Sequence, residues 1–310
     1  MIIDRMNTAM NGIALLPHLG VIRVEGEDAA KFLHGQLTQD FALLDLSEAR
    51  LTAFCSAKGR MLASFIGFKR DQREIVLVCS RDLLVPVMKR LSMFVLRAKA
   101  KLSDASETYR LCGLAGDAVT RVAGPAGAPW SKVEIGPASV VFLYPSDGVA
   151  RALWLAPVGE PLAVAESLDT NDWLHAEVRS GIATITAPVA EAFVPQMLNY
   201  ESVGGVNFKK GCYPGQEVVA RSQFRGTLKR RAFLAHSDSP MVAGEEIFQA
   251  DDASQPRATV VQAASAPSGG FDAIISGQVA ALQSQPLRLG SAQGAVVELQ
   301  AMPYPLVDDV

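Results

Sequence analysis

Lys209-Lys210-Gly211-Cys212-Tyr213-Pro214-Gly215-Gln216-Glu217 is the most distinctive stretch of this chain, because it packs a thiol, two ammonium groups, a phenol, an amide and a carboxylate into nine residues. Glycine on either side of Cys212 lets the backbone turn tightly and lets a ligand approach it closely. The residues that follow form the pattern of a short helix, so the thiol would lie just before a helix N-terminus and beside two lysines. Both neighbours favour the thiolate. The alternative is a tight turn around a half-buried cysteine that only fills space.

This stretch also indicates the fold, through a resemblance. Residues 210–217, continued by Val219-Ala220-Arg221, resemble the signature of the YgfZ family of folate-binding proteins. These proteins are relatives of the glycine-cleavage aminomethyltransferase and act in making or repairing iron–sulfur clusters. Further segments along almost the whole chain are similar to the same family, namely residues 32–40, 55–61, 193–196, 204–210 and 303–306.

The resemblance implies an α+β fold with three domains in a ring, of which two are ferredoxin-like α+β domains and the last is a small C-terminal β-barrel. The pattern of the chain agrees in outline, because two α+β blocks precede evenly spaced short β segments. We expect a split folate-binding domain, an inserted ferredoxin-like domain and a barrel, with bounds of 1–45 plus 160–234, 46–159 and 235–310.

Hydrophobic periodicity predicts the individual elements. Strands are expected at residues 20–24, 50–56, 61–69, 74–80, 95–102, 109–114, 139–144 and 151–156, and helices at 81–93, 117–122, 161–168 and 173–180. Asp28 is expected to cap a helix that contains His34, a residue that we expect to be packed or solvated rather than catalytic. Asn171 and Asp172 are expected to cap the helix that begins at Trp173.

Composition excludes several classes of protein. The 310 residues carry a net charge of −3, which argues against nucleic acid or a membrane surface as a general partner. No apolar run reaches the roughly 20 residues of a membrane span, and no secretory signal is evident at the start of the sequence. The four cysteines are far apart and form no Cys-x-x-Cys pair, so we expect no metal site and no disulfide framework. We therefore expect a cytoplasmic protein, and we expect a monomer.

The segment from Lys209 to Arg231 is strongly basic and contains Glu217 as its one acidic residue. Such a run is often only a solvated face, but it can also form a groove for the glutamate tail of a folate, because arginine pairs well with carboxylates. With the resemblance, this predicts tetrahydrofolate as the cofactor. Cys212 and Lys210 are the expected catalytic residues, and the expected folate contacts are Trp173, Tyr213, Gln216, Glu217, Arg221 and Arg225.

Two departures from the family pattern affect the expected folate site. Trp173 matches a tryptophan that the family uses near folate, and an indole can stack on a pterin ring. Leu19, however, occupies the position of a second such tryptophan, and Arg179 the position where relatives often carry a pterin-binding glutamate. Arginine cannot accept the hydrogen bonds that a pterin donates. Folate recognition is therefore expected to be altered, weakened or moved to Glu177.

The leading hypothesis is a tetrahydrofolate-binding accessory protein for the synthesis or repair of iron–sulfur clusters in client enzymes, which it would contact transiently. The first alternative is a folate-dependent aminomethyltransferase. In the transferase relatives, paired acids follow the first hairpin turn, whereas Leu62 and Ala63 hold those positions here. Neither side chain can move a proton or balance a cation. The second alternative is a folate-binding or RNA-binding module without chemistry.

Overall fold

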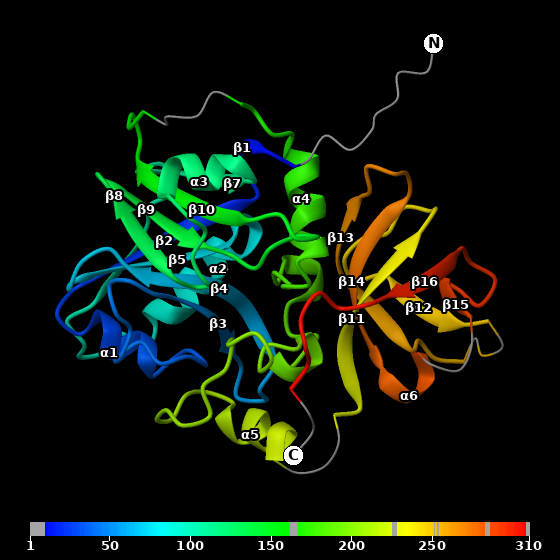
Figure 1. Cartoon of the computed structure of the whole chain (residues 1–310). Helices are drawn as coiled ribbons and strands as arrows, with labels where there is room; N and C mark the ends of the chain where they lie inside the picture. Colours follow the sequence, from blue (N-terminus) through cyan, green and yellow to red (C-terminus); the bar gives the residue numbers. More distant parts are fainter. Residues whose placement is uncertain are drawn as a thin grey trace.

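The computed structural model describes residues 10–161, 166–224, 228–250, 252, 254–282 and 286–307. Two five-stranded antiparallel sheets form one side of the molecule, and a closed β-barrel forms the other (Figure 1). Helix α4 (Thr170–Arg179) lies between the two sides (Figure 1). The expected α+β fold with a C-terminal barrel is confirmed.

The first sheet has the strand order β3-β4-β5-β2-β6. Its strands are β2 (Leu19–Glu25), β3 (Ala49–Cys55), β4 (Met61–Lys69), β5 (Glu74–Ser80) and β6 (Lys101–Asp104). The strands are rich in β-branched and aromatic residues, which suit a pleated sheet. Two helices accompany this sheet, α1 (Ala29–His34) and α2 (Arg81–Ser92).

The second sheet has the strand order β1-β7-β10-β9-β8. Its strands are β1 (Gly12–Leu15), β7 (Tyr109–Ala115), β8 (Lys132–Ile135), β9 (Ala138–Phe142) and β10 (Arg151–Pro157). Helix α3 (Asp117–Ala123) packs on one face of this sheet and buries Ala118 and Val119 there.

The two sheets pack against each other through a shared apolar core. Val21, Phe68 and Val78 of the first sheet lie in one cluster with Val141 and Leu153 of the second. The buried indole of Trp173 joins the same cluster from α4. Burial of apolar surface on this scale is the main force that holds the two layers together.

The barrel closes in the order β11-β14-β13-β12-β15-β16. Its elements are β11 (Arg230–Ser237), β12 (Glu246–Gln249), β13 (Ala258–Ser265), β14 (Phe271–Gln278), α6 (Val279–Leu282), β15 (Leu287–Leu289) and β16 (Val296–Gln300). The segment after β16 runs back from the barrel across the middle of the molecule (Figure 1). There the Tyr304 hydroxyl donates to the Gly181 carbonyl at 2.9 Å, and Arg231 donates to the Val307 carbonyl at 2.7 Å.

The chain between α4 and the barrel is mostly irregular. It contains two short 3-10 turns, η1 (Ala187–Val189) and η2 (Pro195–Leu198), and the helix α5 (Gln216–Phe224). Buried polar side chains fix its path, because Asn199 bonds the Ala232 carbonyl at 3.0 Å and Gln196 bonds the Val219 carbonyl at 2.7 Å. No helix in the described part of the chain is long and apolar enough to span a membrane.

Several local predictions were wrong. The strand expected at 95–102 begins only at Lys101, because the amides of Phe94 and Val95 bond back to the end of α2. Of the helix expected at 161–168, residues 162–165 lie outside the described residues, and 166–168 pair with β1 through the amide of Leu168 and the Ile13 carbonyl at 2.7 Å. These residues are therefore extended.

Two capping predictions also need correction. Asp169, not Asn171 or Asp172, caps α4 by accepting the amide of Asn171 at 2.7 Å. Asp28 holds the N-cap position of α1, but its carboxylate accepts the amide of Lys99 at 2.8 Å instead of one in the first turn.

The expected domain bounds remain a prediction. The first sheet joins β2, from before residue 46, to strands that come after it. A cut at residue 46 therefore runs through a continuous sheet.

Candidate functional site

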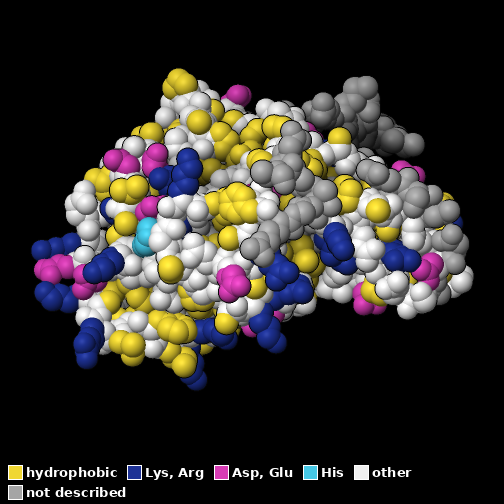
Figure 2. All heavy atoms as spheres, turned by 90° about the horizontal axis from the view of Figure 1, so that it is seen from below, with side chains coloured by type: hydrophobic (Ala, Val, Ile, Leu, Met, Phe, Trp, Pro, Cys, Tyr) yellow, Lys and Arg dark blue, Asp and Glu magenta, His cyan; other side chains and the backbone are white. Residues whose placement is uncertain are grey.

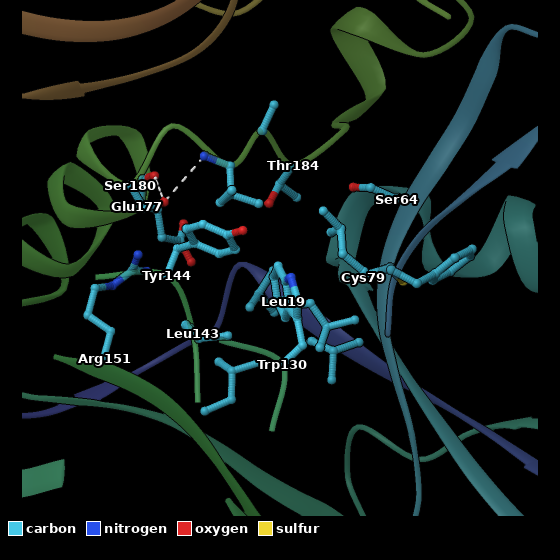
Figure 3. A pocket seen from close by; sticks show the side chains of 17 residues that line it. Leu19, Ser64, Cys79, Trp130, Leu143, Tyr144, Arg151, Glu177, Ser180 and Thr184 are labelled. Atoms are coloured by element: carbon cyan, nitrogen blue, oxygen red, sulfur yellow. Dashed lines mark hydrogen bonds between the residues drawn. The ribbon is translucent and has the colours of Figure 1, made fainter. Parts of the chain in front are cut away.

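A hollow lies where α4 meets the two sheets, and we call it the central pocket (Figure 3). It encloses about 570 Å³, including the open solvent at its mouth. The volume that a water-sized sphere can occupy inside it is only about 50 Å³, below the usual range for small-molecule sites, so a bound small molecule would require the lining side chains to move apart. Most of the wall is apolar, and the side chains that shape it include Leu19, Ser64, Trp130, Tyr144, Arg151 and Glu177.

Glu177 supplies the carboxylate of the central pocket. Its Oε1 accepts from Trp173 Nε1 at 2.9 Å and lies 3.2 Å from His18 Nε2. Its Oε2 accepts only a long bond, of 3.4 Å, from Gln262 among the described residues. One carboxylate oxygen is therefore fixed in place, while the other keeps capacity for a further donor.

The surroundings keep Glu177 ionised. Burial alone would raise the pKa of this carboxyl, but the hydrogen bond and charge of His18, the charge of Arg151 and the Trp173 N–H together hold its pKa below the usual value. Burial lowers the pKa of Arg151 to about 10, and the charge of Glu177 opposes that change. The central pocket therefore holds a charged pair, which a low-dielectric wall strengthens.

Trp173 is fully buried, which differs from the open stacking face that was expected of it. The Arg151 guanidinium carbon lies 4.5 Å from the centre of the indole, a cation–π distance. Gly113 packs so closely that a Cβ there would come within 2.5 Å of the ring. Direct stacking of Trp173 on a pterin stays a prediction that would require Arg151 to move. In this structure the indole acts on the pocket through Glu177, which it holds by a hydrogen bond.

Glu177 and Arg179 are two residues apart on α4 and point to different places. Arg179 leaves the central pocket and pairs with Asp147 at 2.8 Å and with Asp272 at 3.7 Å. The carboxylate in the pocket therefore comes from Glu177. This is the residue to which folate recognition was expected to move if Arg179 could not serve. Leu19 lines the pocket as an aliphatic wall.

Cys212 lies elsewhere, on an exposed loop that precedes α5 and that we call the thiol loop (residues 209–215). The turn of the β3–β4 hairpin packs directly on it. Gly215 has φ +80°, and a Cβ there would lie 2.4 Å from the Ser56 carbonyl oxygen. Gly59 has φ +71°, and a Cβ there would lie 2.9 Å from the Cβ of Val218 on α5. Only glycine fits this positive-φ approach without strain.

Lys210 attaches the thiol loop to α1. Its ammonium is buried, donates to the His34 carbonyl at 2.5 Å and the Leu37 carbonyl at 2.9 Å, and lies 4.5 Å from the centre of the Tyr213 ring. Burial lowers the pKa of Lys210 to about 8, against the charges of Asp40 and Cys212. The carbonyls at a helix C-terminus are favourable partners for such a cation.

The other expected folate contacts gather around the thiol loop and do not line the central pocket. Tyr213 is buried beside Lys210, Gln216 begins α5, and Glu217 and Arg221 are exposed on that helix. Arg225 lies outside the described residues. The roles assigned to these residues stay predictions.

The remaining cysteines are packing residues, as expected. Cys55, Cys79 and Cys112 are buried, whereas Cys212 is exposed. Burial raises the pKa of the first two to about 12 and that of Cys112 to about 11. Among the described residues, no group of three or more His, Cys, Asp or Glu could hold a metal ion.

The central pocket and the thiol loop are two separate places joined by β4. Ser64 of β4 lines the pocket, and the turn before β4 contacts the thiol loop. At about 3.3 Å per residue, Gly59 and Ser64 are on the order of 15 Å apart. The central pocket is therefore not the expected cleft between the Trp173 helix and the Cys212 loop.

Sequence reasoning missed most residues of the central pocket. Trp130, Tyr144 and Arg151 come from separate loops and strands, and none belongs to a local motif. Arg151 at the start of an apolar strand was a usable signal, since a charge that enters a buried strand needs a partner. It points into the pocket beside Tyr144 and Glu177 (Figure 3).

Comparison with known proteins places this architecture. The crystal structure of the glycine cleavage system aminomethyltransferase T from Bartonella henselae is similar over 95% of this chain and 86% of that one, with a TM-score of 0.64 and 16% identity. The chain therefore has the fold of that class of aminomethyltransferases.

Sequence relatives identify the family to which the chain belongs. The tRNA-modifying protein YgfZ of Hamiltonella defensa is 30% identical over 71% of this chain and 68% of that protein. The tRNA-modifying protein YgfZ of Colwellia psychrerythraea is 29% identical over 94% and 93%. A scan against protein-family models finds no match. The chain belongs to the YgfZ family.

Proposed function

We propose that this protein is a tetrahydrofolate-binding accessory protein that supports the synthesis or repair of iron–sulfur clusters in client enzymes, with Cys212 as its working thiol. The observation that carries the folate part is the ionised carboxylate of Glu177 inside a mostly apolar pocket. The exposed thiol on a separate, anchored loop carries the second part.

The residues of the central pocket fit the pterin end of a folate. The exocyclic amine and a ring N–H of a pterin donate hydrogen bonds, and Glu177 Oε2 has capacity to accept them. The rings of Trp130 and Tyr144, whose centres are 5.7 Å apart, offer aromatic surface for a flat heterocycle. When bound, tetrahydrofolate would supply a carrier for one-carbon units. The residues of this chain would orient it and exclude water around it.

The thiol loop has the character of a docking face for a transient macromolecular partner. Figure 2 views the molecule from the α5 side and shows Lys and Arg side chains interspersed with hydrophobic ones. Exposed residues on and beside the loop include Lys209, Arg221, Val218 at 37% and Phe224 at 57% exposure. Mixed apolar and cationic surfaces of this kind suit protein partners. Client enzymes that carry iron–sulfur clusters are the partners we propose.

The names of the relatives call them tRNA-modifying proteins. We propose that this chain supports tRNA modification indirectly, through cluster-containing enzymes, because its net charge of −3 does not favour holding RNA itself. Nucleophilic attack, redox exchange and transient metal contact are the three kinds of chemistry that an exposed thiol such as Cys212 offers. A cytoplasmic location and a monomeric state stay predictions.

The competing function is folate-dependent aminomethyl transfer, and β4 argues against it. Leu62 and Ala63 are buried, uncharged residues at the positions where the transferases carry acids. Purified protein mixed with tetrahydrofolate and an aminomethyl-lipoyl carrier should show no turnover above the uncatalysed rate. Turnover that disappears in Glu177→Gln would establish the transferase.

A deletion strain tests the proposed cellular role. Loss of the gene should lower the activity of several cluster-dependent enzymes, including those that modify tRNA. Wild-type protein and Cys112→Ala should restore these activities, whereas Cys212→Ala should not. Full restoration by Cys212→Ala would remove the thiol from the function.

A further inference from the structure

His34, the last residue of α1, lies between the thiol loop and an acidic side chain. Its Nδ1 is 3.0 Å from Asp40 Oδ1, and 22% of the His34 side chain and 13% of the Asp40 side chain are exposed. On its other edge, Nε2 lies 3.4 Å from the position that a Cβ on Gly211 would occupy. The ring therefore connects Asp40 to the residue that precedes Cys212.

The backbone of Cys212 lies close to this ring. A Cβ position is about 1.5 Å from its Cα, and consecutive Cα atoms are about 3.8 Å apart, so the Cys212 Cα lies within about 9 Å of His34 Nε2. The Cys212 thiol and the His34 ring form no hydrogen bond in this structure, so the loop must shift for the two groups to meet, and the exposed position of Cys212 leaves room for that shift. Contacts between a base and its substrate proton are often long before a ligand binds.

The electrostatic setting suits a base at His34. Asp40 remains charged, because burial of its carboxyl is outweighed by the Leu43 amide and by the hydrogen bond and charge of His34, which lower its pKa. A carboxylate at Nδ1 accepts a hydrogen bond from the ring N–H there. This favours the tautomer that has its lone pair at Nε2, on the side of the thiol loop. Lys210 is a further charged group at this site, and its bond to the His34 carbonyl holds loop and helix together.

We propose that His34 is the general base that activates Cys212. Asp40 positions the His34 ring and stabilises its protonated form. The proposal rests on the proposed function only in taking Cys212 as the working thiol. In the step, the S–H bond of Cys212 breaks and the proton forms an N–H bond at His34 Nε2. The thiolate keeps the electron pair, and the imidazolium is balanced by Asp40. Cysteine activation by a neighbouring histidine follows the same chemistry in other folds.

A histidine with a purely structural role at this position would be expected to form different hydrogen bonds. A side chain that only ended α1 would donate to the open carbonyls of the last turn. Here Lys210 donates to the carbonyls of His34 and Leu37, while the His34 ring bonds Asp40. The sequence-based expectation that His34 is merely packed or solvated is the hypothesis that the experiment must separate from this one.

The test is the rate at which iodoacetamide alkylates Cys212 in the full chain between pH 5.5 and 9, followed by peptide mass spectrometry. His34→Gln should slow alkylation about tenfold near pH 6.5 and approach the wild-type rate near pH 9, because at that pH hydroxide in the solvent can remove the proton in place of a base on the protein. Asp40→Asn should give an intermediate loss. His236→Gln is the matched control, because His236 forms a similar pair with Asp272 at 2.8 Å in the barrel, and it should change nothing.

The outcomes separate the proposals. A His34→Gln rate equal to wild type at every pH, or reduced by the same factor at every pH, would overturn the role of His34 as a base. If Cys212→Ala still failed to restore the deletion strain in that case, the proposed function would stand without the dyad. A deletion strain fully restored by Cys212→Ala would instead refute the part of the proposed function that makes Cys212 the working thiol, whatever the alkylation rates.

Discussion

Replacing Glu177 by glutamine should destabilise the fold because it leaves a buried cation without its counter-charge. Arg151 is 4% exposed, and its Nε has no hydrogen-bond partner among the described residues. Glu177 supplies the charge that opposes the effect of burial on Arg151. The substitution keeps the shape of the side chain and an oxygen for the Trp173 N–H, so it removes mainly the charge.

The expected size follows from the burial of the pair. Breaking a buried ion pair by removing one partner typically costs 3–5 kcal/mol. Glu177 and Arg151 are not in direct contact as an ion pair, 12% of the Glu177 side chain is exposed and glutamine keeps its shape, so we expect a smaller loss, about 1–2 kcal/mol. Urea unfolding at pH 7 measures this difference. The control is Glu217→Gln, which alters an exposed carboxylate on α5. It should change the free energy of unfolding by under about 0.5 kcal/mol.

The pH dependence gives a second signature. The pKa of Glu177 is lower in the folded state than its usual value of 4.5. Its contribution to stability is therefore fully present above pH 4.5 and is lost as the pH falls through the folded-state pKa. Wild type and Glu177→Gln should converge in stability in acid. A Glu177→Gln protein as stable as wild type at pH 7 would refute the reasoning about the charged pair.

Three further outcomes are expected. At neutral pH an alkylating reagent should label Cys212 first, with Cys55, Cys79 and Cys112 reacting only on unfolding, because burial raises their pKa values to about 12, 12 and 11; simultaneous labelling of all four would contradict the structure. Gly215→Ala should lower the free energy of unfolding by about 2 kcal/mol more than Gly136→Ala does. Both glycines have positive φ, but only at Gly215 does a backbone oxygen lie within 2.4 Å of the new Cβ. Equal losses of stability in thermal unfolding would mean that the hairpin and α5 do not meet as described. Burial lowers the pKa of Lys210 from 10.5 to about 8, so the unfolded chain binds more protons than the folded one between these pH values. Wild type should therefore gain stability relative to Lys210→Met as the pH rises from 8 to 10.5. Parallel curves of stability against pH for the two proteins would count against a buried ammonium.

The sequence predicted those parts of the fold that local physics determines. The hairpin turn at residues 57–60 predicted β4, an apolar run predicted β5, the apolar stripe from Leu83 to Leu91 predicted α2, and short strands between turns predicted the barrel. The strands β1 and β8 were not predicted, because each has only four residues; β1 also depends on β7, far along the chain, whereas β8 pairs with the neighbouring β9. Residues 95–98 read as a strand by composition alone, yet Leu96 is 89% exposed in a turn.

The candidate site divides in the same way. The exposed, glycine-bounded Cys212 belongs to a contiguous motif, so its exposure followed from its neighbours. The central pocket depends on single residues brought together by tertiary packing, and no local spacing announces Arg151 or Trp130. The orientation of α4 decided the rest. One helix directs Glu177 into the pocket and Arg179 toward Asp147, a difference that the sequence order cannot reveal.

Calorimetric titration with tetrahydrofolate is the most direct test of the central claim that the pocket around Glu177 holds a folate. Wild type should bind one equivalent, with quenching of tryptophan emission. Glu177→Gln, verified as folded at the temperature used, should bind about 10- to 100-fold more weakly, the loss expected for one charged hydrogen bond of roughly 1.5–3 kcal/mol. Arg179→Ala, two residues along the same helix but outside the pocket, should bind as wild type does. Equal affinity in wild type and Glu177→Gln, or no heat at millimolar ligand, would contradict the account.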